Sequence, residues 1–353
     1  MSNESAIELG QHLTALLTTG KRTTTYKFAL AMALMDYSIE HLPDDSHASL
    51  KVSIKKLADY VIGYYWNQVE MYDDEVAYLF HGSDKNKKPT ITRAIREFKD
   101  EHADFKNVER ARESLVEYSK LVDKVAVALA ENPIPRLQTI GKNTYAGSQV
   151  LYDIAWTHES YSKRALDDLK WELVLLPGVA WSLAHLSQLL RPFIEMQWQS
   201  DLVSFNKAHL KIDRLSDFLW GANRTNVAVL ATDLTELQDG YCFYCQTKLS
   251  SKKTHVDHVL PWSRFLINGV SNLVATDDKC NLNKSDNLPI QKHIQNALDR
   301  NLSELSAIAS KRNFAVMQES TQLIATNIYK ITPVGTPLWV GRGKDPEPHT
   351  LTA

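Results

Sequence analysis

The sequence predicts a mainly α-helical chain with a small α+β module towards its C-terminal end. Apolar residues recur at helical spacing through most of residues 1–235. Residues 256–260 are instead rich in strand-forming side chains and end at Pro261, and a helix start follows near residue 281. At 353 residues, the chain is long enough for two or three domains. We expect a helical domain over 1–235, a compact module over 236–300, and a C-terminal helix and tail over 301–353 that pack on the module.

The first half of the chain contains several expected helices. Residues 7–17 have apolar side chains at helical spacing, and residues 26–39 are apolar on most faces, which is typical of a buried central helix. Residues 52–66 are similar and rich in aromatic side chains. From Val108 to Leu129, apolar residues alternate in steps of three and four, which predicts one long helix that Asn132–Pro135 ends. Its apolar seam fits either packing inside a helical bundle or a coiled-coil dimer.

Loops and shorter elements complete the expected order. Turn-forming residues predict loops over 82–89 and 136–147. We expect an extended segment at 171–176 with a helix after it to about residue 207, a polar helix at 290–312, and a tail over 338–348 that forms one strand and then coil.

Nothing in the sequence predicts a membrane segment. The most apolar long window, residues 173–193, contains Pro177, His185, Arg191 and Pro192 and so does not resemble a membrane span. No signal peptide is recognised, and three cysteines are too few and odd in number for a disulfide framework. We therefore expect a cytoplasmic protein with reduced thiols.

The overall charge excludes one class of function. A formal net charge of −2 and a pI near 6.6 are not those of a protein that coats DNA. Two basic runs could each contact DNA or form solvated helix ends and loops. They consist of Lys21, Arg22 and Lys27, and of Lys85, Lys87, Lys88, Arg93 and Arg96.

A cluster of polar residues in the module suggests chemistry on phosphate. His255, Asp257, His258, Asn272, Asn281 and Lys284 lie within 30 residues. Phosphodiester hydrolysis needs a base for water near neutral pH, which an imidazole supplies. It also needs a hard cation to stabilise negative charge, and carboxylate and amide oxygens suit Mg²⁺ without saturating it. Because Asp257 and His258 are adjacent, a regular strand would turn them to opposite faces, so we expect a distorted strand end.

The stretch from Tyr241 to Pro289 resembles the HNH endonuclease family. It carries Cys-Phe-Tyr-Cys245, Val-Asp-His258-Val-Leu-Pro, Asn272-Leu-Val and Cys280-Asn-Leu-Asn-Lys284. From residue 256 onward its spacing is also similar to the HNH domain of RNA-guided CRISPR nucleases. The resemblance implies a β-hairpin packed on a helix around one metal, the ββα-metal fold.

The resemblance also implies roles for individual residues. His258 would be the general base, and Asp257 and Asn281 would bind a catalytic Mg²⁺ or Mn²⁺. Asn272 would hold the loop and orient His258, as a member of the catalytic set. His255 lies two residues before Asp257, where it would support the metal from a second shell or act as an extra ligand.

The cysteines suggest a second metal. Cys242 and Cys245 have zinc-knuckle spacing, and Cys280 supplies a third thiolate. Family members with this knuckle usually have a second Cys-x-x-Cys or His-x-x-Cys pair, but Asp277 stands in its first position here. We expect structural Zn²⁺ on Cys242, Cys245, Asp277 and Cys280. The alternative is three reduced cysteines that pack as small apolar residues.

Basic side chains near the cluster are candidate nucleic-acid contacts. Residues 248–284 contain six basic and three acidic side chains, which gives this stretch a formal charge of +3. Arg264, Lys279 and Lys284 are the proposed contacts, with Lys284 serving either phosphate or structure. Trp262 and Phe265 could stack on bases or pack in the core.

The sequence thus predicts a metal-dependent endonuclease that hydrolyses DNA. One module cuts one strand, so a monomer would nick, and a double-strand break would need a homodimer or two encounters. The long helical region resembles that of bacterial HNH proteins of restriction and antiviral defence, where it would serve recognition, assembly or control through an activating partner. Two alternatives stay open: a nucleic-acid-binding or partner-binding protein whose module is only structural, and an RNA-cleaving nuclease.

Overall fold

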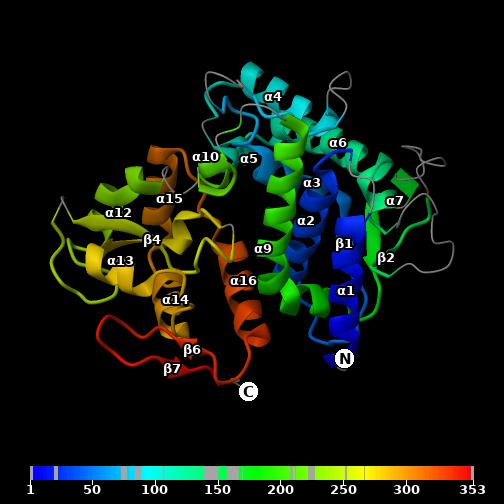
Figure 1. Cartoon of the computed structure of the whole chain (residues 1–353). Helices are drawn as coiled ribbons and strands as arrows, with labels where there is room; N and C mark the ends of the chain where they lie inside the picture. The colour runs from blue at the N-terminus through cyan, green and yellow to red at the C-terminus, as the bar shows by residue number, and fades with distance from the viewer. Residues whose placement is uncertain are drawn as a thin grey trace. The chain divides into compact units, whose positions relative to one another are not determined.

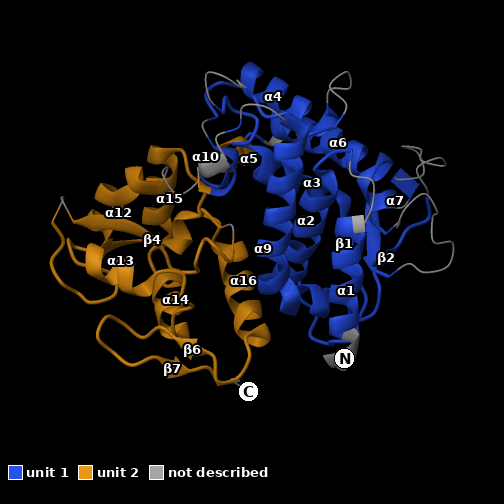
Figure 2. Cartoon of the chain, in the orientation of Figure 1, with its two compact units in different colours: residues 1–108, 114–220 blue, residues 109–113, 221–353 orange. Residues whose placement is uncertain are grey.

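The chain forms two compact units, which are described separately (Figure 2). One comprises residues 1–108 and 114–220, and the other comprises residues 109–113 and 221–353. The computed structural model describes residues 3–19, 23–72, 78–83, 89–105, 107–138, 150–156, 167–168, 170–206, 210, 212–221, 227–250, 253–265 and 267–350. Most of the two predicted loops, and the basic residues Lys21, Arg22, Lys85, Lys87, Lys88 and Lys252, lie outside these ranges.

The prediction of a mainly helical chain with a small α+β module is confirmed. In the first unit, α2 (Tyr26–Glu40) is buried along nearly its whole length, as its sequence predicts, and α3 (Ile54–Tyr65) and α9 (Val179–Asn206) pack on it (Figure 1). The other helices among the described residues of this unit are α1 (Asn3–Thr19), α4 (Thr90–Glu101), α6 (Leu115–Glu131), α7 (Pro133–Leu137), α10 (Ile212–Ser216) and the π-helical turn η1 (Asp217–Gly221), which ends one residue beyond the unit. Within the described ranges, no helix is both long and apolar enough to cross a membrane.

A small antiparallel sheet belongs to the same unit. Its central strand is β3 (Glu172–Leu175), which lies in the segment predicted to be extended, between β1 (Leu50–Ser53) and β2 (Tyr152–Asp153). The expected start of a helix at Val52 is wrong, because residues 50–53 pair with β3 and Ser53 caps the helix, its Oγ accepting a hydrogen bond from the Lys56 amide at 3.3 Å.

The single long helix predicted from Val108 is also wrong. It is interrupted at Ser114, which separates α5 (Val108–Glu113) from α6. Ser114 has non-helical backbone angles, and its hydroxyl donates to Glu117 at 2.6 Å. The helix therefore breaks at Ser114 despite the continuous apolar seam, and the Ser114 side chain makes no capping hydrogen bond to the backbone of α6. Since α6 packs on α3 and α4 within its own unit, the seam serves a bundle, the first of the two interpretations.

The second unit is built around a hairpin and a short helix. Strands β4 (Thr254–His258) and β5 (Leu273–Asp277) pair antiparallel, and α13 (Asp278–Lys284) follows β5 directly. The expected ββα arrangement is therefore present. Beneath the hairpin, residues of η2 (Val227–Leu230), α12 (Ala231–Leu237), η3 (Val270–Asn272) and α15 (Leu302–Arg312) form a hydrophobic core.

The C-terminal part is more ordered than the sequence suggests. The predicted polar helix over 290–312 is two helices, α14 (Gln291–Leu298) and α15, because Asn301 caps the second by accepting a hydrogen bond from the Ser303 amide at 3.0 Å. A further helix, α16 (Gln318–Ile331), was not expected. The tail is not one strand and coil: β6 (Pro337–Leu338) and β7 (Glu347–Pro348) pair antiparallel.

Arg300, in the break between α14 and α15, holds the start of β5 in place. Its guanidinium donates to the carbonyls of Val270 at 3.1 Å, and of Ser271, Leu273 and Ala297 at 2.8 Å each. Burial lowers the pKa of Arg300 to about 10. One side chain therefore satisfies the carbonyls of η3, which precedes β5, and ties them to the end of α14.

We predict that Arg300→Ala destabilises the second unit. Hydrogen bonds to a charged donor contribute roughly 1.5–3 kcal/mol each, and relaxation recovers part of the loss, so the free energy of unfolding should fall by about 3 kcal/mol. Urea denaturation followed by circular dichroism measures this change. Lys292→Ala on the exposed face of α14 is the control and should stay within about 0.5 kcal/mol of wild type. Equal unfolding midpoints for the two variants would contradict the prediction.

Candidate functional site

The hairpin and α13 bring the predicted residues to two ends of one short structure. Thr254 pairs with Asp277 at one end of the ladder, and His258 pairs with Leu273 at the other. At about 3.4 Å per residue, these ends lie roughly 14 Å apart. Helix α13 starts after Asp277 and packs on both strands, so its last residue, Lys284, reaches the His258 end. The two strands pair in register from Thr254 to His258.

Asp257 is held by two donors on the same oxygen. The carboxylate is buried, 8% exposed, and its Oδ2 accepts a hydrogen bond from the Tyr244 hydroxyl at 2.6 Å. The Lys284 ammonium lies 3.0 Å from the same Oδ2. Among the described residues, no side chain or amide donates to Oδ1. Asp257 is thus held by two donors through one of its oxygens.

The Lys284 side chain is buried inside the domain and does not lie on its surface. Its side chain is fully buried, and Nζ also donates to the His258 carbonyl at 2.7 Å. Burial lowers the pKa of Lys284, and the Asp257 carboxylate opposes that shift. The proposal of Lys284 as a nucleic-acid contact is therefore wrong for this geometry, because a buried ammonium paired with a carboxylate cannot reach phosphate. The structural role, the other one suggested for it, fits.

His258 is buried and held by a residue that sequence reasoning missed. Its Nε2 lies 2.8 Å from the side-chain oxygen of Asn268, which is 4% exposed. At this distance the Asn268 side chain hydrogen-bonds the ring and holds it through Nε2. The Trp262 ring packs 5.5 Å from the imidazole. An asparagine four residues before Asn272 was the available signal, but many asparagines occupy loops.

Asn272 fixes the loop that carries Asn268. Its Oδ1 accepts from the Leu260 amide at 2.8 Å, and its Nδ2 donates to the carbonyls of Leu260 at 3.1 Å and Ile267 at 3.2 Å. The loop between the strands is thereby closed at both ends. Any orienting effect of Asn272 on His258 passes through this loop and Asn268.

The other predicted residues are more accessible. Asn281 is half-buried in the middle of α13, and His255 is exposed, opposite Thr276 in the ladder. Arg264 is half-buried and Lys279 is exposed. Trp262 and Phe265 are 8% and 4% exposed, so both pack in the core. Of the described arginines in the basic runs, Arg93 pairs with Glu97 and Arg96 lies over the Tyr78 ring.

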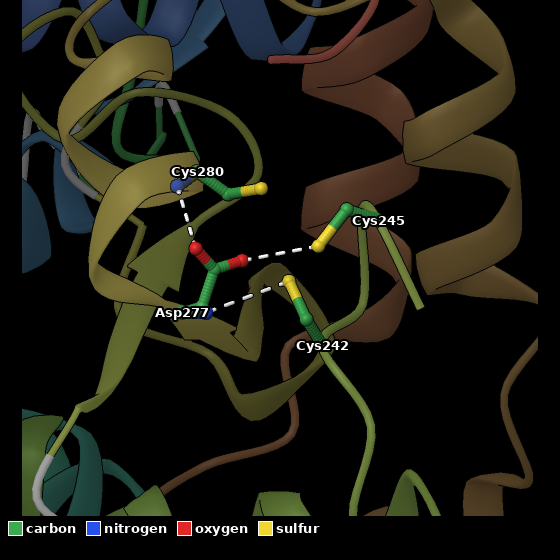
Figure 3. A group of neighbouring side chains, drawn as sticks. All are labelled: Cys242, Cys245, Asp277 and Cys280. Carbon is green, nitrogen blue, oxygen red and sulfur yellow. Dashed lines mark hydrogen bonds between the residues drawn. The ribbon is translucent and has the colours of Figure 1, made fainter. Parts of the chain in front are cut away.

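Cys242, Cys245, Asp277 and Cys280 form the second cluster (Figure 3). Their ligand atoms all lie within 4.8 Å of one another. Tetrahedral Zn²⁺ with bonds of about 2.3 Å to sulfur separates its ligands by roughly 3.8 Å, so a small closure would suffice. Cys242 and Cys280 are buried, and Cys245 is exposed. The donor set and its spacing fit a structural Zn²⁺ ion.

Asp277 has two separate tasks in this cluster. Its Oδ1 caps α13 by accepting from the amides of Lys279 at 3.0 Å and Cys280 at 3.1 Å, while Oδ2 faces the Cys245 thiol at 3.1 Å (Figure 3). Burial alone would raise the pKa of Asp277, but hydrogen bonds from the three thiols hold it well below its usual range. Burial and the Asp277 carboxylate raise the pKa of Cys280. One carboxylate can therefore cap the helix and still offer an oxygen to a metal.

Comparison with known families supports two assignments. A family model described as HNH endonuclease matches residues 242–290, the stretch that contains both clusters. A model described as a domain of unknown function (DUF8808) matches residues 5–219, more than half of the chain. No curated protein and no solved structure matches the chain. The chain therefore belongs to the DUF8808 family and carries an HNH endonuclease domain after that region.

Proposed function

We propose that this protein is a metal-dependent endonuclease that cuts one strand of DNA at the hairpin of its HNH domain. The observation that carries the proposal is the pair Asp257 and His258, neighbours on β4 that are buried and separately held by Lys284, Tyr244 and Asn268. Burying a carboxylate and an imidazole at the end of one strand costs stability, and a role in catalysis would account for both residues there. The match to the HNH endonuclease family supports the same chemistry.

His258 acts as the general base in this proposal. With its ring held at Nε2 by Asn268, His258 would take the proton from water. The Asn268 oxygen then stabilises the imidazolium that forms. The rigid loop closed by Asn272 keeps the ring in one orientation while the proton moves.

Asp257 and Asn281 are the proposed ligands of the catalytic cation. Asp257 would offer Oδ1, and Asn281 its side-chain oxygen from α13, which packs on β4. Bound Mg²⁺ or Mn²⁺ would supply charge stabilisation for the phosphate and the leaving oxygen. His255, exposed on the same strand face as Asp257, would assist from a second shell. Arg264 and Lys279 remain the proposed phosphate contacts.

The family resemblance also supports a biological setting. We propose that the DUF8808 region provides recognition, assembly or control, and that the protein acts in restriction or antiviral defence. A single HNH domain contains one set of cutting residues, so a monomer would nick. Comparing cleavage of a DNA with cleavage of an RNA of the same sequence tells which of the two is the substrate. If the protein binds nucleic acid but cleaves neither, the HNH domain has a structural role only.

We predict that the protein converts supercoiled plasmid to nicked circles in Mg²⁺ or Mn²⁺ and not in EDTA. A general base contributes roughly 10²–10⁴-fold, so His258→Ala should lower the nicking rate by at least about 100-fold. Asn281→Ala should lower it comparably through the cation. Gln295→Ala, on the exposed face of α14, is the matched control and should keep the wild-type rate. Supercoiled plasmid left intact by wild type under every condition would contradict the function.

We also predict about one zinc per chain in freshly purified protein, measured by elemental analysis. Asp277→Asn keeps an acceptor for the cap of α13 but removes the carboxylate ligand, so it should lose most of the zinc. Asp277→Cys gives up the cap and completes a four-cysteine set, so it should retain zinc. Less than about half a zinc per wild-type chain, or equal zinc in both variants, would overturn the assignment.

A third prediction concerns Asn268. Asn268→Ala removes the 2.8 Å hydrogen bond to Nε2 of His258, so the orientation of the ring is less well fixed. The nicking rate should fall roughly 10–100-fold, as is common for partners of functional side chains. Single-turnover assays measure it, and zinc content serves as the check on folding. An unchanged rate would assign Asn268 to loop structure alone.

A further inference from the structure

Tyr244 occupies an unusual position between the two clusters. It stands in the turn Cys242-Phe-Tyr-Cys245, so its backbone is flanked by two of the candidate zinc ligands. Its hydroxyl nevertheless donates to Oδ2 of Asp257, near the other end of the hairpin, at 2.6 Å. The residue therefore spans the distance between the candidate zinc site and the candidate cation site. Neither packing nor zinc binding requires a hydroxyl there.

Three rings hold the Tyr244 ring edge-to-face. Centroids lie 4.8 Å from Trp339, 5.2 Å from His293 and 5.1 Å from Phe243, with interplanar angles of 82–85°. Such contacts restrict an aromatic ring more than apolar burial alone. The Tyr244 side chain is thus confined on several sides, which holds its hydroxyl beside Asp257.

Trp339 is itself fixed by the main chain. Its amide donates to the Leu288 carbonyl at 2.8 Å, its carbonyl accepts from the Ile290 amide at 3.0 Å, and its indole donates to the Asn283 side chain at 2.9 Å. His293 is fixed in turn by the Val340 carbonyl, 2.9 Å from its Nε2. The segment after β6 and helix α14 therefore hold the two rings, Trp339 and His293, against which Tyr244 packs.

The consequence for Asp257 is a defined carboxylate orientation. Lys284 and Tyr244 both bind Oδ2, one from α13 and one from the cysteine turn. A single donor would leave the carboxylate plane free to rotate about that contact, whereas two donors from different directions fix it. Oδ1 is then held in one direction, in which it would bind the cation.

We propose that Tyr244 is a positioning residue that orients Asp257 for the divalent cation, using the cysteine turn and Trp339 as its support. The inference rests on the proposed function only in that Asp257 binds the cation. A merely structural tyrosine would contribute through its ring, and phenylalanine would replace it without effect on the cation. A positioning tyrosine acts through its hydroxyl.

The test compares Tyr244→Phe with Tyr241→Phe, an exposed tyrosine three residues earlier, in the zinc-loaded full-length protein. Mn²⁺ binding is titrated by electron paramagnetic resonance, with zinc content and circular dichroism measured in parallel. Loss of an outer partner of a metal ligand typically costs 10–100-fold in affinity, so Tyr244→Phe should raise the Mn²⁺ Kd by about 10-fold at unchanged zinc content. Tyr241→Phe should match wild type.

The outcomes separate this inference from the proposed function. A wild-type Mn²⁺ Kd in Tyr244→Phe would overturn the inference, as would wild-type protein that binds no Mn²⁺. A Tyr244→Phe protein that loses zinc or its helical spectrum would assign the hydroxyl to folding and also overturn it. Weaker Mn²⁺ binding in Tyr244→Phe, together with a wild type that leaves plasmid intact, would uphold the inference while the nuclease function fails.

Discussion

The buried Lys284 ammonium is the interaction on which the HNH domain of this chain depends. It comes from the last turn of α13 and binds both the Asp257 carboxylate and the His258 carbonyl, so one group joins the helix to the end of β4. A charge with no exposed surface is tolerated only when it is paired and hydrogen-bonded, and removing one partner of such a pair typically costs about 3–5 kcal/mol. Helix, strand and carboxylate must therefore be in place together.

Asp277 provides the corresponding constraint at the other end of the ladder. It ends β5, caps α13 and faces the thiols, so the turn from strand to helix and the candidate zinc site share a single carboxylate. A cysteine at this position would be a stronger zinc ligand but could not cap the helix as well. The departure from a four-cysteine set thus has a structural reason.

Much of this arrangement could be predicted because its signals are local. Adjacent Asp257 and His258, the Cys-x-x-Cys spacing and the predicted helix start near residue 281 all lie within about 50 residues, and the resemblance of this stretch to the HNH family implied the hairpin and the helix. Tyr244, Asn268 and Arg300 were missed because their partners are set by tertiary packing. The break at Ser114 was missed because the apolar pattern continues across it, while the backbone at Ser114 is not helical.

The contact of Trp339 with the Tyr244 ring bears on the order in which the HNH domain is assembled during synthesis. A chain emerging from the ribosome presents the cysteine turn, the hairpin and α13 well before residue 339 is available. Before residue 339 is synthesised, Asp257 and Lys284 can pair, but the Tyr244 ring lacks its contact with the Trp339 ring. The proposed alignment of Asp257 by Tyr244 therefore depends on a segment that is synthesised well after the hairpin.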